Sequence, residues 1–234
     1  MLFRVLPLLL LLPATLAADA VPARSTKEAL QGFHNLIGNW KGTGTPSTGT
    51  REERDRGFWL EAIRWQWQFK GKDTWLSADV EKGKHFTGFE LRYQPKTDDF
   101  SLVATTTDKQ SLTFTGTLAN KRLTVDRVDS KTKQTQRLVF SLLHSNRHLY
   151  TSETRADGGT QFAKVYQVGA TKQGVAFATG DTAPECVVSG GLGTTPVTYM
   201  GKTYYVCCSG CRDAFKEEPA KYVKEFEARK KEKK

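Results

Sequence analysis

Cysteine is scarce in this chain and absent from most of it. The 234 residues include four cysteines, and the first of them is Cys186. Disulfides and thiol chemistry are therefore excluded from everything before that position. The same region lacks the GxSxG, HExxH and glycine-rich phosphate-binding motifs of common hydrolases and nucleotide-binding proteins. We expect a binding protein and not an enzyme.

Long apolar runs are also scarce. One run extends from Val5 to Leu12, after the basic Arg4 and before small residues that continue to Ala20. This arrangement is typical of a secretory signal peptide, so residues 1–20 are predicted to be one. No later stretch approaches the roughly 20 apolar residues that a membrane helix needs. We expect export to the periplasm or the extracellular space, without a membrane span.

Positive charge predominates but forms no compact block. Lys and Arg number 35 against 25 Asp and Glu, which gives a net charge of +10. The basic residues are interspersed with acidic ones, as on a solvated surface, and no basic and aromatic motif typical of nucleic-acid binding occurs. We expect no nucleic-acid partner, and a weak contact with anionic surfaces stays an open expectation.

Alternation of apolar and polar residues dominates residues 21–168. In one stretch Ile63, Trp65, Trp67 and Phe69 fall on one side, with polar or charged residues between them. A period of two indicates strands and not helices. Ahead of the first strand, the segment Ser25-Thr26-Lys27-Glu28 has the spacing of a helix capping box, so a short helix is expected there.

Short turns separate about nine or ten such strands. The turns are rich in Gly, Asn, Asp and Lys, as in residues 70–73, 81–84 and 156–159. Short connections make neighbouring strands antiparallel, and closing the sheet removes its exposed edges. The prediction is a mainly β fold with an antiparallel up-and-down barrel over residues 21–168.

The segment LIGNWKGTGT, from Leu36 to Thr45, carries a family resemblance. It resembles the glycine and tryptophan opening of lipocalin-like barrels, and more specifically the small bacterial barrels related to nitrobindin. The resemblance implies an interior that binds a small apolar ligand or, as in nitrobindin, haem held by a histidine near the barrel end. The histidines available for this role are His34, His85, His144 and His148.

Four residues are candidates for contacting a ligand in the barrel: Trp65, Trp67, His144 and His148. The two histidines flank a turn at residues 145–147 and would face one another across a hairpin if both pointed inward. The alternative is that they are polar residues beside an exposed turn. For the tryptophans, the alternative is the core itself, because large aromatic side chains at a period of two bury much apolar surface.

A second unit is predicted after the barrel. Residues 169–184 are rich in Gly, Ala and Thr and indicate a linker. Residues 185–234 indicate a small α+β module with a hairpin around Met200-Gly201-Lys202, a helix that Pro219 interrupts, and a basic tail. A unit of this size is near the limit at which an apolar core suffices, so disulfides or a metal are expected to stabilise it.

The candidate metal ligands are Cys186, Cys207, Cys208 and Cys211. Twenty residues separate Cys186 from Cys207, and three separate Cys207 from Cys211. Together with the hairpin YMGKTYYV and the ending PAKYV, this pattern resembles the TRASH and YHS families of small metal-binding modules. The resemblance implies that Cys186, Cys207 and Cys211 bind the metal.

Cys208 has a separate argument. It forms a CxxC pair with Cys211, a spacing that suits tetrahedral zinc. Adjacent residues of a strand point to opposite faces, so Cys207 and Cys208 reach one ion only if the strand has already ended. Whether Cys208 is a ligand stays open at this point.

Metal binding and disulfides are both consistent with the cysteine pattern. An even number of cysteines in an exported chain is typical of disulfides, but bridges within residues 207–211 would close short loops and stabilise little. A structural zinc supplies about 10–16 kcal/mol in small peptides, and sulfur ligands suit zinc or copper(I). We expect an exported heavy-metal-binding protein that acts in metal trafficking, sensing or sequestration. The alternative is a carrier of a small apolar ligand or haem whose C-terminal module is only a stapled appendage.

Overall fold

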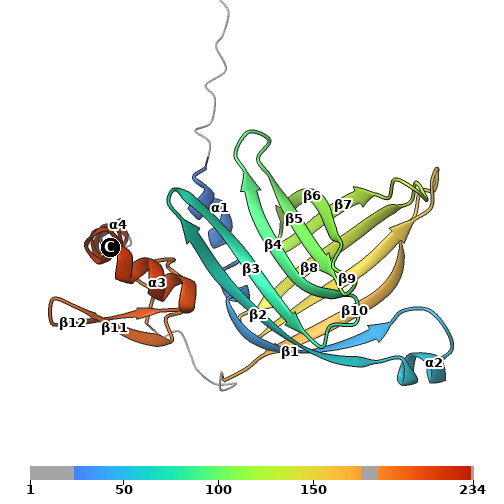
Figure 1. Cartoon of the computed structure of the whole chain (residues 1–234), viewed down its shortest axis with the longest axis horizontal. Helices are drawn as coiled ribbons and strands as arrows, with labels where there is room; N and C mark the ends of the chain where they lie inside the picture. The colour runs from blue at the N-terminus through green and yellow to red at the C-terminus, as the bar shows by residue number, and fades with distance from the viewer. Residues whose placement is uncertain (1–23, 175–183, 233–234) are drawn as a thin grey trace, which may run out of the picture.

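The computed structural model describes residues 24–174 and 184–232, and it is mainly β (Figure 1). Ten strands form a closed barrel in the order β1-β10-β9-β8-β7-β6-β5-β4-β3-β2. Strands that follow one another in the chain are antiparallel neighbours, and β1 pairs with β10 to close the sheet. The predicted up-and-down barrel with a small C-terminal module is therefore confirmed. The expected signal peptide, residues 1–20, lies outside the described residues.

The barrel strands follow the alternation and the turns of the sequence. Tight turns take left-handed backbone where the chain reverses, for example at Gly71 (φ 59°) and Gly158 (φ 69°). The strand bounds are β1 Gly38–Pro46, β2 Trp59–Lys70, β3 Asp73–Glu81, β4 Phe86–Gln94, β5 Asp99–Thr106, β6 Ser111–Ala119, β7 Arg122–Val128, β8 Thr135–His144, β9 Arg147–Arg155 and β10 Ala163–Lys172.

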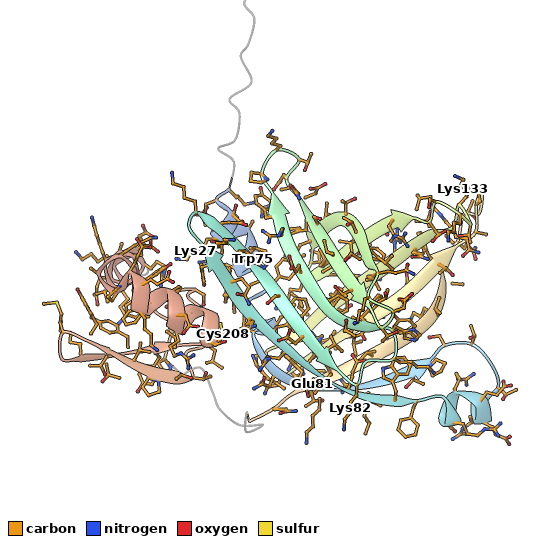
Figure 2. The ribbon with its side chains drawn as sticks, viewed as in Figure 1. Lys27, Trp75, Glu81, Lys82, Lys133 and Cys208 are labelled. Carbon is orange, nitrogen blue, oxygen red and sulfur yellow. The ribbon has the colours of Figure 1, made fainter. Side chains whose placement is uncertain are left out.

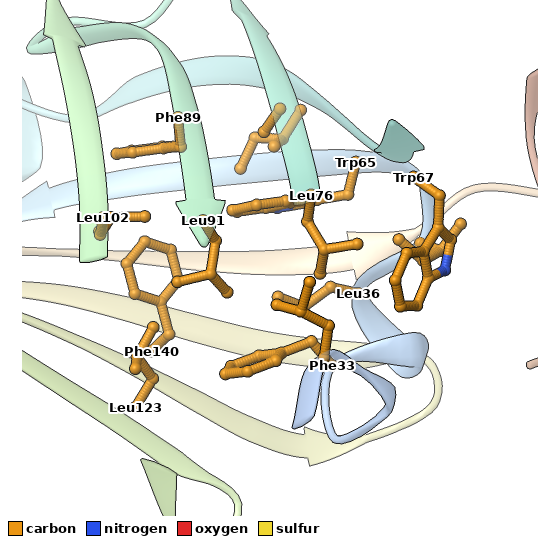
Figure 3. Close-up of a cluster of buried hydrophobic side chains, with 14 of the residues drawn as sticks. Phe33, Leu36, Trp65, Trp67, Leu76, Phe89, Leu91, Leu102, Leu123 and Phe140 are labelled. Atoms are coloured by element: carbon orange, nitrogen blue, oxygen red, sulfur yellow. The ribbon is translucent and has the colours of Figure 1, made fainter. Parts of the chain in front are cut away.

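Large apolar side chains fill the barrel interior. Trp65 on β2, Phe89 on β4 and Phe140 on β8 pack against one another, with ring centroids 5.5–6.1 Å apart. Figure 3 shows these rings with Leu76, Leu91 and Leu102 from neighbouring strands in one cluster. The inward positions of the period-two pattern therefore form a packed core. Trp65, for which the sequence allowed either a ligand contact or a place in the core, belongs to this core.

Short helices accompany the barrel near the N-terminus. α1 (Thr26–Gln31) has the expected capping box, with Ser25 as its N-cap. It continues into a 3-10 turn, η1 (His34–Leu36), and Phe33 and Leu36 are buried against the barrel interior (Figure 3). A second helix, α2 (Arg51–Arg56), has its own capping box at Thr50, was not predicted, and lies between β1 and β2.

The C-terminal module consists of residues 184–232 as described. It has a hairpin of β11 (Thr195–Tyr199) and β12 (Lys202–Val206), followed by α3 (Ser209–Glu217) and α4 (Pro219–Glu232). The hairpin and the interruption at Pro219 agree with the sequence, and α3 begins at Ser209, directly after the cysteine pair. No helix in the two described parts of the chain is long and apolar enough to cross a membrane.

The module packs on the barrel mainly along β2, and Lys27 and Gln31 of α1 also bond to Glu225 and Ser189 of the module. β1 pairs with β2 only as far as Trp65, and no described strand covers the same edge of β2 beyond it. α3 contacts β2, and Figure 1 shows it lying toward this strand. β10 runs to Lys172, past the predicted boundary at residue 168, because its pairing with β1 continues to Trp40. Most of the predicted linker, residues 175–183, lies outside the described residues.

Candidate metal centre

Three cysteine sulfurs lie together in the C-terminal module. The Sγ atoms of Cys186, Cys207 and Cys211 are all within 4.8 Å of one another. Cys207 Sγ is 3.5 Å from Cys211 Sγ and 3.9 Å from Cys208 Sγ. Neighbouring sulfurs around a tetrahedral zinc, with Zn–S of about 2.3 Å, are about 3.8 Å apart, so these residues fit a thiolate-bound metal. All four cysteines are free thiols.

The local fold explains how residues distant in sequence meet. Cys186 is held beside β12 by a parallel bridge to Tyr205, and the Val187 N–H donates to the Tyr205 carbonyl at 2.8 Å. β12 ends at Val206, so Cys207 and Cys208 no longer alternate as strand residues. Cys208 is the N-cap of α3, and Cys211 lies in its first turn. The strand has therefore ended before Cys207 and Cys208, as is required if both sulfurs are to approach one metal ion.

Ser189 is a polar neighbour of the sulfurs that the sequence did not single out. Its backbone N–H donates to Cys186 Sγ at 3.4 Å, and its hydroxyl lies 3.4 Å from Cys207 Sγ. The side chain is fully buried. The one available signal was its spacing, because Ser189 follows Cys186 by the same three positions that separate Cys208 from Cys211.

The four thiols differ in pKa because of burial and of hydrogen bonds to one another. Hydrogen bonding with Cys207 and Cys211 lowers the pKa of Cys186 to about 2 and that of Cys208 to about 4. Burial raises the pKa of Cys211 well above its usual range, and hydrogen bonding to Cys186 raises that of Cys207. The sulfurs thus share protons among themselves, and a soft metal ion would displace those protons.

The barrel contributes to the surroundings of Cys208. Besides Cys207 and Cys211, the backbone of Trp67 on β2 contributes to the lowered pKa of this thiol. Next to it, the Ser209 hydroxyl donates to Gln66 Oε1 at 2.8 Å. Figure 2 shows Cys208 on the side of the module that faces the barrel. The fourth cysteine therefore lies at the junction of the two units.

A half-buried lysine of the barrel lies on the same side. Lys172 Nζ donates to the carbonyl of Asn35 at 3.1 Å and lies 5.1 Å from the centre of the Trp40 ring. Burial lowers the pKa of Lys172 to about 8, and the nearby sulfur of Cys207 opposes this shift. The ammonium and the thiols line a common cleft of about 350 Å³ between barrel and module.

The four barrel candidates do not form one site. Trp65 and Trp67 are 1% and 0% exposed, and neither indole N–H has a partner among the described residues. His148 is 1% exposed, with its ring 4.4 Å from that of Trp40. A bulge between Leu142 and His144 leaves His144 exposed beside the turn, so the two histidines do not face one another.

A separate cavity of about 260 Å³ opens elsewhere in the barrel. It is lined by His85 and Tyr166, whose rings stack at 4.0 Å, and by apolar residues of β6 and β8. Nearby, the buried Glu61 accepts hydrogen bonds from Trp59 Nε1 and the Tyr150 hydroxyl, both at 2.7 Å. Neither His144 nor His148 lines this cavity.

Comparison with protein families supports a metal-associated module. The family described as the YHS domain matches residues 195–225, which span β11, β12, α3 and the first part of α4. The match includes Cys207, Cys208 and Cys211, and Cys186 lies ahead of it. A comparison with curated proteins finds no match. The YHS domain is associated with metals, and the cysteine cluster is consistent with metal binding.

Proposed function

We propose that this is an exported protein that binds a soft heavy-metal ion, zinc or copper(I), through the cysteines of its C-terminal module. The observation that carries the proposal is the group of three sulfurs within 4.8 Å of one another. Thiolates prefer zinc and copper(I) among the metals available to proteins. The match to the YHS domain supports the same conclusion.

Cys186, Cys207 and Cys211 hold the metal in this proposal. Ser189 orients two of the sulfurs through its backbone N–H and hydroxyl. Without metal, the sulfurs share protons in a buried cluster. Binding of the metal ion replaces these protons, which are released to solvent. Cys186 and Cys211, both 0% exposed, exclude water from one side of the site.

The export and the biological role are parts of the same proposal. The signal-like residues 1–20 support export. The lipocalin-like relationship of the barrel and the TRASH relationship of the module rest on the sequence patterns described above. A binding protein whose thiol site opens to solvent on the side of Cys207 suits metal trafficking, sensing or sequestration, without catalysis.

Anaerobic purification tests the proposal. The unmodified protein should retain about one equivalent of zinc or copper and four titratable thiols after the metal is removed. Cys211→Ser should lose most of the metal, whereas Ser209→Ala, a neighbouring change that removes no sulfur, should retain it. Four oxidised cysteines and no metal in protein taken directly from its native compartment would contradict the proposal.

Carriage of a small apolar ligand is the second candidate function. The cavity beside His85 and Tyr166 favours it, because its lining is largely apolar with a few polar groups. Filling the cavity by Leu112→Trp should abolish binding of an apolar fluorescent probe and leave metal content unchanged. Haem absorption that disappears in His148→Leu would favour a haem carrier instead.

A further inference from the structure

The cleft between the barrel and the C-terminal module has a wall of thiols. Cys207, Cys208 and Arg212 form the module's side, and Asn39, Arg64 and Lys172 belong to the barrel's side. Cys186 and Cys211 do not line it. A metal bound by the three clustered sulfurs would therefore be approached from this cleft.

The cleft is positively charged. Arg64, Lys172 and Arg212 line it, and no Asp or Glu does so among the described residues. The guanidinium groups of Arg64 and Arg212 also pair with Asp79 and Asp213, at 2.9 and 3.2 Å, outside the cleft. Lys172 forms no ion pair in residues 24–174 and 184–232, and its hydrogen bond is to a neutral carbonyl. A half-buried cation without a carboxylate partner favours an anionic ligand.

The sulfur cluster is also one ligand short of a tetrahedral set. Cys208 is near Cys207 but does not belong to the group of three within 4.8 Å. It is the N-cap of α3, which packs on β2. Zinc in a closed site takes four ligands, so a three-sulfur site keeps one position open toward the cleft.

We propose that the cleft binds a small thiol that carries a carboxylate, and that its sulfur becomes the fourth ligand of the metal. The inference rests on the proposed function. The thiol proton passes to solvent as the sulfur binds, and the metal-bound water leaves. The carboxylate faces Lys172, Arg64 and Arg212, which also offset the negative charge of a dication with four thiolates. The volume of about 350 Å³ suits a compound of this size.

Cobalt(II) provides the test, because its absorption reports the number of thiolates and the tetrahedral geometry. The Co²⁺-loaded protein is titrated with N-acetylcysteine and with N-acetylcysteine amide, which share the thiol and differ in charge. Both should increase the thiolate-to-metal absorption, and the acid should bind about tenfold more tightly. Lys172→Met should remove this preference, whereas Lys164→Met, on the same strand but exposed, should retain it.

The outcomes separate this inference from the proposed function. Equal binding of acid and amide, or a four-thiolate spectrum before any thiol is added, would overturn the inference and leave the metal site in place; the second result would identify Cys208 as the fourth ligand. Absence of Co²⁺ binding would overturn both. If Lys172→Met does not fold, as judged by circular dichroism, Arg212→Gln on the surface of α3 should show the same reduced preference.

Discussion

His148 is an ionisable side chain that the barrel holds in its neutral form. It is 1% exposed, packs against Trp40, and has no hydrogen-bond partner for either ring nitrogen among the described residues. Burial lowers its pKa to about 3. In the unfolded chain the pKa of histidine is about 6.5, so protonation favours unfolding as the pH falls between these values.

Replacing His148 should therefore flatten the pH dependence of stability. The contribution of neutral His148 is complete above pH 6.5 and is lost below it by about 1.4 kcal/mol per pH unit, until the folded-state pKa is reached. Between pH 7 and pH 5, the unmodified protein should lose about 2 kcal/mol more of its unfolding free energy than His148→Leu. Urea unfolding at the two pH values measures the difference.

His144→Leu is the matched control, because His144 is exposed at the other end of the same turn. It should preserve the steep pH dependence of the unmodified protein. Identical pH profiles for the unmodified protein and His148→Leu would show that His148 does not titrate in this range.

The ligand cysteines could be predicted from spacing, but their neighbours could not. Cys186, Cys207 and Cys211 fall in a recognisable pattern, and the structure brings them together. Lys172 comes from the last barrel strand, and nothing in its local sequence indicates a position beside a thiol. Its position depends on the packing of two units, which a periodic pattern within one segment cannot describe.

At the scale of elements, α3 takes the place of a missing strand neighbour on β2. Exposed strand edges invite pairing with other chains, and the edge of β2 beyond Trp65 is covered by the start of α3. Gly210 lies at this contact, where a side-chain Cβ would collide with the carbonyl oxygen of Trp67. The glycine therefore allows the helix and the strand to approach closely.

Gly210→Ala should separate the metal site from the barrel. Because the clash is with backbone, α3 must shift, and the shift should move Cys208 and Cys211 from their positions. We expect the affinity for Zn²⁺ to fall about tenfold, which corresponds to about 1.4 kcal/mol. Competition with a chromophoric chelator measures this affinity.

Gly169→Ala provides the comparison, because a Cβ there would meet Leu149 at an ordinary 3.5 Å. Its effect on zinc affinity should be within about twofold, less than the roughly tenfold change that 1.4 kcal/mol produces. Unchanged affinity in Gly210→Ala would show that the contact with β2 does not position the cysteines.

The barrel strands and the hairpin followed from local signals, whereas the contacts between elements did not. Alternation placed Trp65 and Trp67 on the inner face, and short turns dictated antiparallel neighbours. The bulge near His144 changes which side chains face inward, and it arises from the pairing of β8 with β9. No local pattern predicted it, because register depends on the partner strand.

At the scale of the whole molecule, the two units share structure at the metal site. Gly210 of α3 lies against the Trp67 carbonyl, the Ser209 hydroxyl donates to Gln66, and Lys172 lines the thiol cleft. Metal binding in the module should therefore stabilise the barrel as well. All five tryptophans lie in the barrel, at positions 40, 59, 65, 67 and 75, so their fluorescence follows the unfolding of the barrel alone.

Zinc should consequently raise the urea midpoint that tryptophan fluorescence reports. A ligand at 100 times its Kd stabilises the folded state by about 2.7 kcal/mol when one cooperative unit unfolds. Cys211→Ser should show no zinc-dependent shift, while Ser209→Ala should retain part of it because α3 still packs on β2. If circular dichroism at the helical wavelength shifted with zinc but fluorescence did not, the module would unfold independently. In that case the module would contact β2 without contributing to the stability of the barrel.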